Sequence, residues 1–167
     1  MRYVLIDRFL EIVPGVSAVA VKTFRAEDDF FADHFPGFPV VPGALIAEAL
    51  GQTAGWLLSY SSGFRHWPLL NMIDRMKLRR FVRAEEEVRM SARVRSSRER
   101  DFEVDAEAEV GGKRVAGGRF LFHAFSPEAI EGADAAPLRA WTSAVAADLF
   151  ASLSPAPAGG PAAPESR

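Results

Sequence analysis

The sequence predicts an α+β domain in which one long helix is followed by most of an antiparallel sheet. Three observations support this fold class. An Ala- and Leu-rich stretch without proline, from Ala44 to Leu58, has the composition of a largely buried helix. Four later segments alternate apolar and polar side chains, as strands with one solvated face do. Gly111-Gly112 separates the last two segments and indicates a tight hairpin between them.

The chain before the helix predicts one or two short strands and a helical turn. The segment from Arg2 to Val13 predicts a short strand or a turn of helix, and it ends at the turn signal Pro14-Gly15. Alternation then predicts a strand over Ser17 to Phe24. The acidic stretch from Glu27 to Asp33 predicts a single helical turn. With the later segments, the sheet should have about five to six strands.

The four later strands differ in how clearly they alternate. Alternate residues from Leu70 to Met76 are expected on one face of the first strand, and alternate residues from Val88 to Val94 on the buried face of the second. A Ser- and Gly-containing loop, Ser59 to Gly63, precedes the first of them. The predicted ranges are 67–78, 85–98, 102–110 and 114–125.

The C-terminal part divides into an appendage and a tail. Residues 1–125 are expected to form the domain, and residues 126–153 a helical appendage. Leu138, Trp141, Val145 and Leu149 recur at spacings of three and four, which predicts an amphipathic helix within Ala136–Leu153. Residues 154–167 are rich in proline and alanine, and their low complexity predicts disorder.

Candidate chemistry is concentrated at the start of the long helix. Glu48 and Gln52 are one helical turn apart on the same face of an otherwise apolar helix. Glu48 would be either a surface residue on an exposed stripe or a buried group. Burial disfavours the charged form of a carboxyl group, so a buried Glu48 would be available as a general acid. Gln52 would hold its carboxyl group in orientation.

A rigid loop precedes this helix. The run from Phe35 to Gly43 contains three prolines and two glycines and must be extended. His34 stands directly before it; a lone histidine there could be purely structural, but beside a candidate acid it is a candidate base. Gly43 would offer its N–H at the helix N-terminus, where an oxyanion is stabilised.

These residues carry a resemblance to a known family. The string HFPGFPVVPGALIAEALGQ resembles the signature of the beta-hydroxyacyl-acyl-carrier-protein dehydratases of the FabZ and FabA type. A weaker resemblance extends from about Leu5 to about Phe125. The ten matching positions of the signature are His34, Phe35, Pro36, Gly37, Pro39, Pro42, Gly43, Glu48, Ala49 and Gln52.

The resemblance implies a hotdog fold, with a long central helix wrapped by an antiparallel sheet, and dehydration of a 3-hydroxyacyl thioester carried on acyl carrier protein. It implies a homodimer or a trimer of dimers, in which His34 of one subunit faces Glu48 of the other. A heterodimer with a related subunit is a further possibility. No metal and no organic cofactor is needed. The pathway could be fatty acid, lipid A, polyketide or polyene synthesis.

Three departures from the family pattern indicate a divergent member. Asp33 replaces the usual glycine before the histidine, and Gly51 precedes the glutamine. The segment Arg79–Glu87 replaces the usual proline- and glycine-containing turn. The alternatives are a hotdog acyl thioesterase, a dehydratase that also isomerises the double bond, and a non-catalytic acyl-binding subunit.

A basic cluster follows the first late strand. It is either a solvated strand face or a docking site for an acidic carrier protein and its phosphopantetheine phosphate. His66 and His123 lie far from the motif, and no third residue at metal-ligand spacing accompanies them. The candidate docking residues are Lys77, Arg79, Arg80 and Arg83.

Composition excludes several classes of protein. The 167 residues suffice for one domain with a core, and the net charge of -2 provides no general attraction to nucleic acid. The absence of cysteine excludes disulfides and thiolate metal sites. No apolar run approaches the roughly 20 residues of a membrane span, and the N-terminus lacks a signal-peptide pattern, so the cytoplasm is expected.

Overall fold

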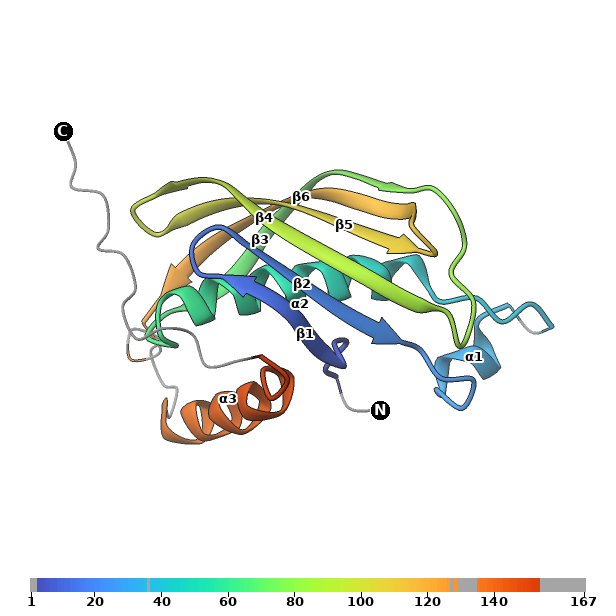
Figure 1. The fold of residues 1–167 in the computed structure, drawn as a ribbon, viewed down its shortest axis with the longest axis horizontal. Coiled ribbons are helices and arrows are strands. Elements are labelled where there is room, and N and C mark those ends of the chain that lie inside the picture. Colours follow the sequence, from blue (N-terminus) through green and yellow to red (C-terminus); the bar gives the residue numbers. More distant parts are fainter. Residues whose placement is uncertain (1–2, 36, 127, 129–134, 154–167) are drawn as a thin grey trace.

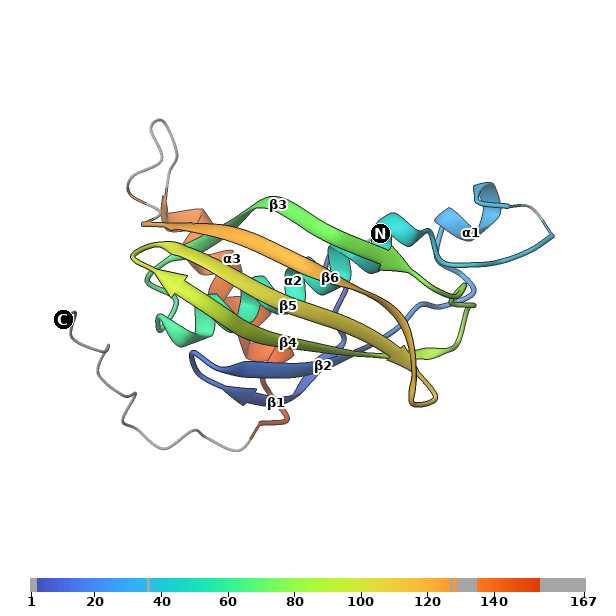
Figure 2. The same cartoon turned by 90° about the horizontal axis from the view of Figure 1, so that it is seen from above.

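The structure, a computed structural model, describes residues 3–35, 37–126, 128 and 135–153. Its centre is a six-stranded antiparallel sheet in the order β1-β2-β4-β5-β6-β3, with β1 and β3 at opposite edges (Figures 1 and 2). This confirms the predicted fold class. The strands are β1 (Arg8–Val13), β2 (Ser17–Thr23), β3 (Trp67–Leu78), β4 (Glu87–Arg98), β5 (Asp101–Val110) and β6 (Lys113–Phe125).

The long helix α2 (Gly43–Ser61) lies along one face of this sheet (Figure 1). It starts one residue before the predicted range and continues three residues beyond it, because no helix breaker occurs before Gly63. The Ser62 N–H closes the last turn on the Leu58 carbonyl. Thr53 is fully buried, and its hydroxyl donates to the Ala49 carbonyl, so this polar group is satisfied inside the core.

Small residues in the sheet allow α2 to pack closely. Ala18, Ala92, Ala106 and Gly118 lie opposite one another on four adjacent strands. The predicted alternation of β4 is confirmed, since Val88, Met90 and Ala92 are buried and Arg89, Ser91 and Arg93 are exposed. A row of short side chains leaves room for the bulkier side chains of the helix. The core contains Leu50 and Leu57 of α2 together with larger residues from the rest of the domain, among them Phe9, Phe24, Met90, Val104 and Phe120.

Edge strand β3 differs from its prediction. The expected alternation from Leu70 to Met76 is wrong: Leu70 and Met72 are exposed, and Ile73 on the other face is exposed too. The register to β6 shifts between Leu70 and Met72 and again between Asp74 and Lys77. Such bulges interrupt the alternation of faces. As a result β3 presents a row of apolar side chains at a strand edge that pairs with no described strand.

The predicted helical turn is α1 (Phe30–Asp33), and the first predicted strand is β1, which starts at Arg8.

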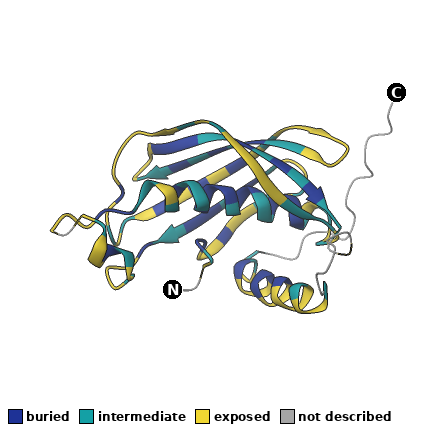
Figure 3. Ribbon diagram, turned by 180° about the vertical axis from the view of Figure 1, so that it is seen from behind, coloured by how far each residue is buried: buried dark blue, intermediate teal, exposed yellow. Residues whose placement is uncertain are grey.

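The predicted appendage helix is α3 (Ala135–Leu149), which starts one residue earlier and ends four residues earlier than expected. Its buried face includes Val145 and Leu149 (Figure 3). The predicted tail over 154–167 lies outside the described residues. No helix in the described part of the chain is long and apolar enough to cross a membrane.

Candidate active site

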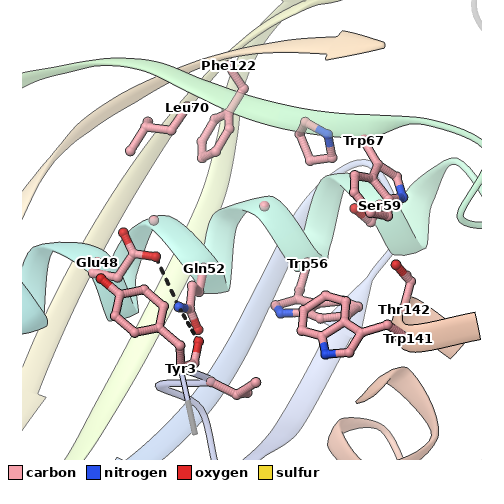
Figure 4. Close-up of a pocket in the computed structure, with 14 residues that line it drawn as sticks. Tyr3, Glu48, Gln52, Trp56, Ser59, Trp67, Leu70, Phe122, Trp141 and Thr142 are labelled. Atoms are coloured by element: carbon pink, nitrogen blue, oxygen red, sulfur yellow. Dashed lines mark hydrogen bonds between the residues drawn. The ribbon is translucent and has the colours of Figure 1, made fainter. Parts of the chain in front are cut away.

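Glu48 and Gln52 form a fixed pair on α2. The Gln52 Nε2 donates to Glu48 Oε1 at 3.0 Å and contacts the Tyr3 carbonyl at 3.2 Å. The Gln52 Oε1 accepts the Leu5 N–H at 2.8 Å. Because the backbone N–H of Leu5 needs an acceptor, the carbonyl end of the Gln52 amide must face Leu5 and its NH2 end must face Glu48 (Figure 4). The second carboxyl oxygen of Glu48 makes no hydrogen bond to the described residues.

The carboxyl group of Glu48 opens into a cavity of about 370 Å³. Trp56, Trp67, Leu70 and Phe122 are among the side chains that line it (Figure 4). Glu48 is half-buried in the single chain, so the prediction that its helix is enclosed on most sides overstated its burial. The reason is geometric: the sheet covers one face of α2 and leaves the Glu48 side partly open.

His34 follows α1 directly and lines a second cavity, of about 570 Å³. Its backbone N–H donates to the Phe30 carbonyl at 2.9 Å, and its ring packs against Phe35 with a centroid distance of 4.5 Å. Phe35 has a φ of 52°, a left-handed conformation that is uncommon for a bulky residue and recurs at functional sites. Asp33 is exposed and forms no described ion pair with His34.

A carboxylate clamp holds the segment that leads to α1. Glu85 accepts hydrogen bonds from the Ala26 N–H and the Arg25 guanidinium, both at 2.9 Å. Its own N–H donates to the Phe24 carbonyl. The Ala26 N–H, followed by Arg25, lowers the pKa of Glu85, because both stabilise the carboxylate. Glu85 is therefore ionised near neutral pH. It links the β3–β4 connection to Arg25 and Ala26, in the segment that leads to α1 and His34.

Gly43 begins α2 and lines the same cavity as His34. A Cβ atom at this position would lie 2.3 Å from Leu78 Cδ1, so a larger residue would require the exposed Leu78 side chain at the end of β3 to move. As the first residue of the helix, Gly43 has an N–H with no intrahelical acceptor. This N–H and the positive end of the helix can stabilise a negatively charged oxygen near His34.

In one chain, the four candidate residues form two separate half-sites. His34 and Gly43 line the second cavity, whereas Glu48 and Gln52 line the first, and the two linings have no residue in common. Helix geometry explains the separation: Gly43 and Glu48 are five residues apart, about 140° around the axis of α2 and about 7.5 Å along it. The single chain thus does not bring the candidate base to the candidate acid.

The four basic docking candidates are all exposed at the end of β3 and in the loop after it: Lys77, Arg79, Arg80 and Arg83. Arg79 and Arg80 also line the His34 cavity, next to Phe81. Arg80 pairs with Glu86 at 3.3 Å, and Arg83 lies over the ring of Phe38 at 5.9 Å. No group of three or more potential metal ligands occurs within the described ranges.

Two parts of the site had no signal in the sequence. The backbone of Tyr3 and Leu5 orients Gln52 across 49 and 47 positions of the chain. Trp141 and Thr142 of α3 complete the lining of the Glu48 cavity. Both contributions come from segments outside the motif, and contacts over such separations depend on how the chain packs.

Comparisons with known proteins agree with this architecture. A model of the FabA-like domain family matches residues 1–119. A 3-hydroxyacyl-(acyl-carrier-protein) dehydratase FabZ from Streptococcus mutans is 38% identical over 119 residues, which is 71% of this chain and 84% of that protein. The FabZ of Clostridioides difficile is 31% identical over 121 residues, 72% of this chain and 85% of that protein.

Solved structures share the fold. The conserved protein PA5202 from Pseudomonas aeruginosa superposes with a TM-score of 0.57 at 25% identity, over 71% of this chain and 87% of that one. The AziG protein of S. sahachiroi has a TM-score of 0.59 at 16% identity, with 71% and 90% covered. At that identity the likeness concerns the hotdog arrangement of helix and sheet alone.

Proposed function

Because the chain belongs to the family of FabA-like hotdog domains, we propose that it removes water from a 3-hydroxyacyl thioester to form the trans-2-enoyl thioester. One observation carries the proposal beyond the family. Gln52 holds one carboxyl oxygen of Glu48, and the carboxyl group opens into a largely apolar cavity, so it is positioned to act on a substrate bound there.

The reaction needs two proton transfers: one removes a proton from C2 of the acyl chain, and the other protonates the hydroxyl group on C3. His34 takes the proton from C2, and the electron pair of that C–H bond becomes the C2–C3 double bond. The C3–O bond breaks, and Glu48 donates its proton to the departing hydroxyl, which leaves as water. The Gly43 N–H donates a hydrogen bond to the thioester oxygen and so stabilises the negative charge that develops there; such donors contribute about 3 kcal/mol in other enzymes.

The two half-sites become one site if two subunits pair along β3. Leu69, Leu70, Met72 and Ile73 are exposed on this strand, and its outer edge pairs with no described strand. An apolar edge strand of 12 residues is a template for pairing with another chain. A second copy of this protein satisfies that edge through a two-fold axis.

The direction of β3 explains why such a dimer would complete the site. Leu70, near the start of β3, lines the Glu48 cavity, and Leu78, at its end, lines the His34 cavity. Antiparallel pairing across a two-fold axis places the start of one β3 beside the end of the other. Glu48 would then face His34 of the partner subunit, and each dimer would hold two sites.

The substrate would arrive on an acyl carrier protein. Arg79 and Arg80, just after β3, line the His34 cavity together with the exposed ring of Phe81. No acidic side chain in the described part of the chain pairs with Arg79 or Lys77. Unpaired cations beside an exposed aromatic ring suit an acidic partner that carries a phosphate group.

Charge reversal tests the docking surface. The double variant Lys77→Glu and Arg83→Glu is expected to raise KM for carrier-bound substrate by about tenfold, with a weaker salt dependence, because rim charges steer association. KM for the same acyl group on pantetheine should stay unchanged. The matched control is Arg93→Glu, an exposed arginine on β4 that lines neither cavity. Equal loss with both substrates would contradict docking at this surface.

The activity itself is tested with purified protein and 3-hydroxyoctanoyl thioester. We expect the absorbance of a conjugated enoyl thioester to rise while no free thiol is released. Thiol release without enoyl formation would identify a thioesterase instead. Tight binding of the thioester without either product would identify a non-catalytic acyl-binding subunit, and either result would overturn the proposed dehydration.

A further inference from the structure

The cavity that contains Glu48 is polar at one end and apolar along the rest of its length. Glu48 and Gln52 lie at the polar end, and Trp56, Phe122 and Trp67 line the part beyond them (Figure 4). Such a cavity matches a ligand with one reactive polar end and a hydrocarbon chain, since few polar groups fix orientation and apolar walls bind the remainder.

Two glycines keep this cavity open. Glu48, Gln52, Gly55 and Ser59 follow one another at spacings of four, three and four, and so share one face of α2. A Cβ atom at Gly55 would contact Phe122 and Pro68 at 3.8 and 3.9 Å, and one at Gly51 would contact Leu70 at 3.5 Å. Any larger side chain would fill the space between α2 and β3.

Helix α3 borders the end of the cavity far from Glu48, where the Trp141 side chain is 53% exposed. Trp141 packs beside Trp56 with a centroid distance of 6.4 Å, and Thr142 lies next to it (Figure 4). The Thr142 hydroxyl donates its proton to the Leu138 carbonyl within α3, so it has no proton left to donate into the cavity. This end of the cavity is mainly aromatic, with the hydroxyl groups of Ser59 and Thr142 among the three tryptophan rings.

Helix α3 is firmly attached to the domain. Val145 and Leu149 belong to the main hydrophobic core. Directly after the helix, Phe150 stacks on Phe9 of β1 with a centroid distance of 4.6 Å, and the Ser152 hydroxyl donates to the Phe9 carbonyl. The helix follows the region that the family model matches, so this end wall is an addition to the family domain.

We propose that α3 sets the length of the acyl chain, with Trp141 as the residue that limits this protein to medium-length substrates. The inference rests on the proposed dehydration at Glu48. From Glu48 to Trp56 the cavity follows α2 for about 12 Å. That is shorter than the ~15 Å that long lipid chains fill in each half of a bilayer core.

Opening the end wall tests the proposal. In wild type, kcat/KM is expected to be higher for 3-hydroxyoctanoyl than for 3-hydroxypalmitoyl thioester. Trp141→Ala should raise the palmitoyl-to-octanoyl ratio of kcat/KM by about tenfold or more, which is the discrimination that one or two methylenes supply in an apolar pocket. Trp141→Phe, which keeps an aromatic wall, should stay close to wild type. An unchanged ratio in Trp141→Ala would overturn the role of α3.

Two further variants provide a control and an independent test. Ser143→Ala, an exposed position on the same helix outside the cavity, is the matched control and should keep the wild-type ratio. Gly55→Ala narrows the cavity from the opposite wall and should favour the shorter chain, and alanine strengthens the helix, so folding is not lost. No shift toward shorter chains in Gly55→Ala would contradict a chain lying along α2.

A binding measurement separates this inference from the proposed chemistry. All three tryptophans of the chain, Trp56, Trp67 and Trp141, line the cavity, so intrinsic fluorescence reports directly on its occupation. Octanoyl-pantetheine should change the emission of wild type. Trp141→Ala should bind palmitoyl-pantetheine about tenfold more tightly than wild type does. If no thioester is dehydrated but this shift in binding is seen, the proposed dehydration is wrong and the role of Trp141 in limiting chain length is supported. If binding does not shift, the role of Trp141 is wrong.

Discussion

Replacing His34 by alanine or Glu48 by glutamine is expected to abolish dehydration without unfolding the protein. General acid–base groups contribute roughly 10²–10⁴-fold to rate, so each variant should lose at least about a hundredfold in kcat. Glutamine at position 48 can still accept the Gln52 N–H, which preserves the hydrogen bond at 3.0 Å in the wild-type protein but removes the transferable proton. Steady-state rates of enoyl formation provide the measurement.

Matched controls exist for both substitutions. His66→Ala removes a histidine that lines neither cavity, and Glu11→Gln neutralises an exposed carboxylate on β1. Both controls should keep wild-type rates. Melting curves of all four variants should agree within a few degrees, since neither His34 nor Glu48 belongs to the hydrophobic core. Wild-type turnover by either His34→Ala or Glu48→Gln would remove the proposed acid–base pair.

Mixing the two inactive variants under conditions that exchange subunits is expected to restore activity. A heterodimer of His34→Ala and Glu48→Gln contains one site with both wild-type residues and one site with neither. With random exchange about half of the dimers are mixed, so the recovered rate should approach about a quarter of the wild-type rate. The expectation follows from the separate half-sites in one chain and from the exposed edge of β3.

Each variant incubated with itself serves as the control and should remain inactive. Differently tagged subunits allow the mixed dimers to be purified and counted, so that activity is expressed per heterodimer. An inactive sample in which heterodimers are present would show that His34 and Glu48 do not act across subunits. Rescue would place the two groups in one site that neither chain contains alone.

Much of the site could be predicted from sequence because its signals are local. Three prolines between His34 and Gly43 determine an extended loop, and the next residues form a helix with Glu48 and Gln52 one turn apart. The structure confirms the helix, which begins at Gly43, and shows a hydrogen bond between the side chains of Glu48 and Gln52. Proline geometry and helix periodicity, which act over a few residues, account for the helix, its start and the closeness of Glu48 to Gln52.

The tertiary structure alone decided three other features. Docking of α2 on the sheet formed a separate cavity beside each of Gly43 and Glu48 and left Glu48 half-buried. Packing of the N-terminal segment supplied the backbone groups that orient Gln52. Docking of α3 on β1 brought Trp141 to the far end of the Glu48 cavity.

The physical reason for this division is the range of the interactions. Periodicity, proline geometry and capping act over one or two helical turns, so the sequence by itself determined the helix, most strands and the pairing of Glu48 with Gln52. The range of edge strand β3 was predicted, but the faces of its side chains were not, because its bulges and exposed apolar residues break the alternation that marks a half-buried strand. Contacts between segments separated by tens of residues depend on strand register and on how side chains interlock in the core, which no local pattern records.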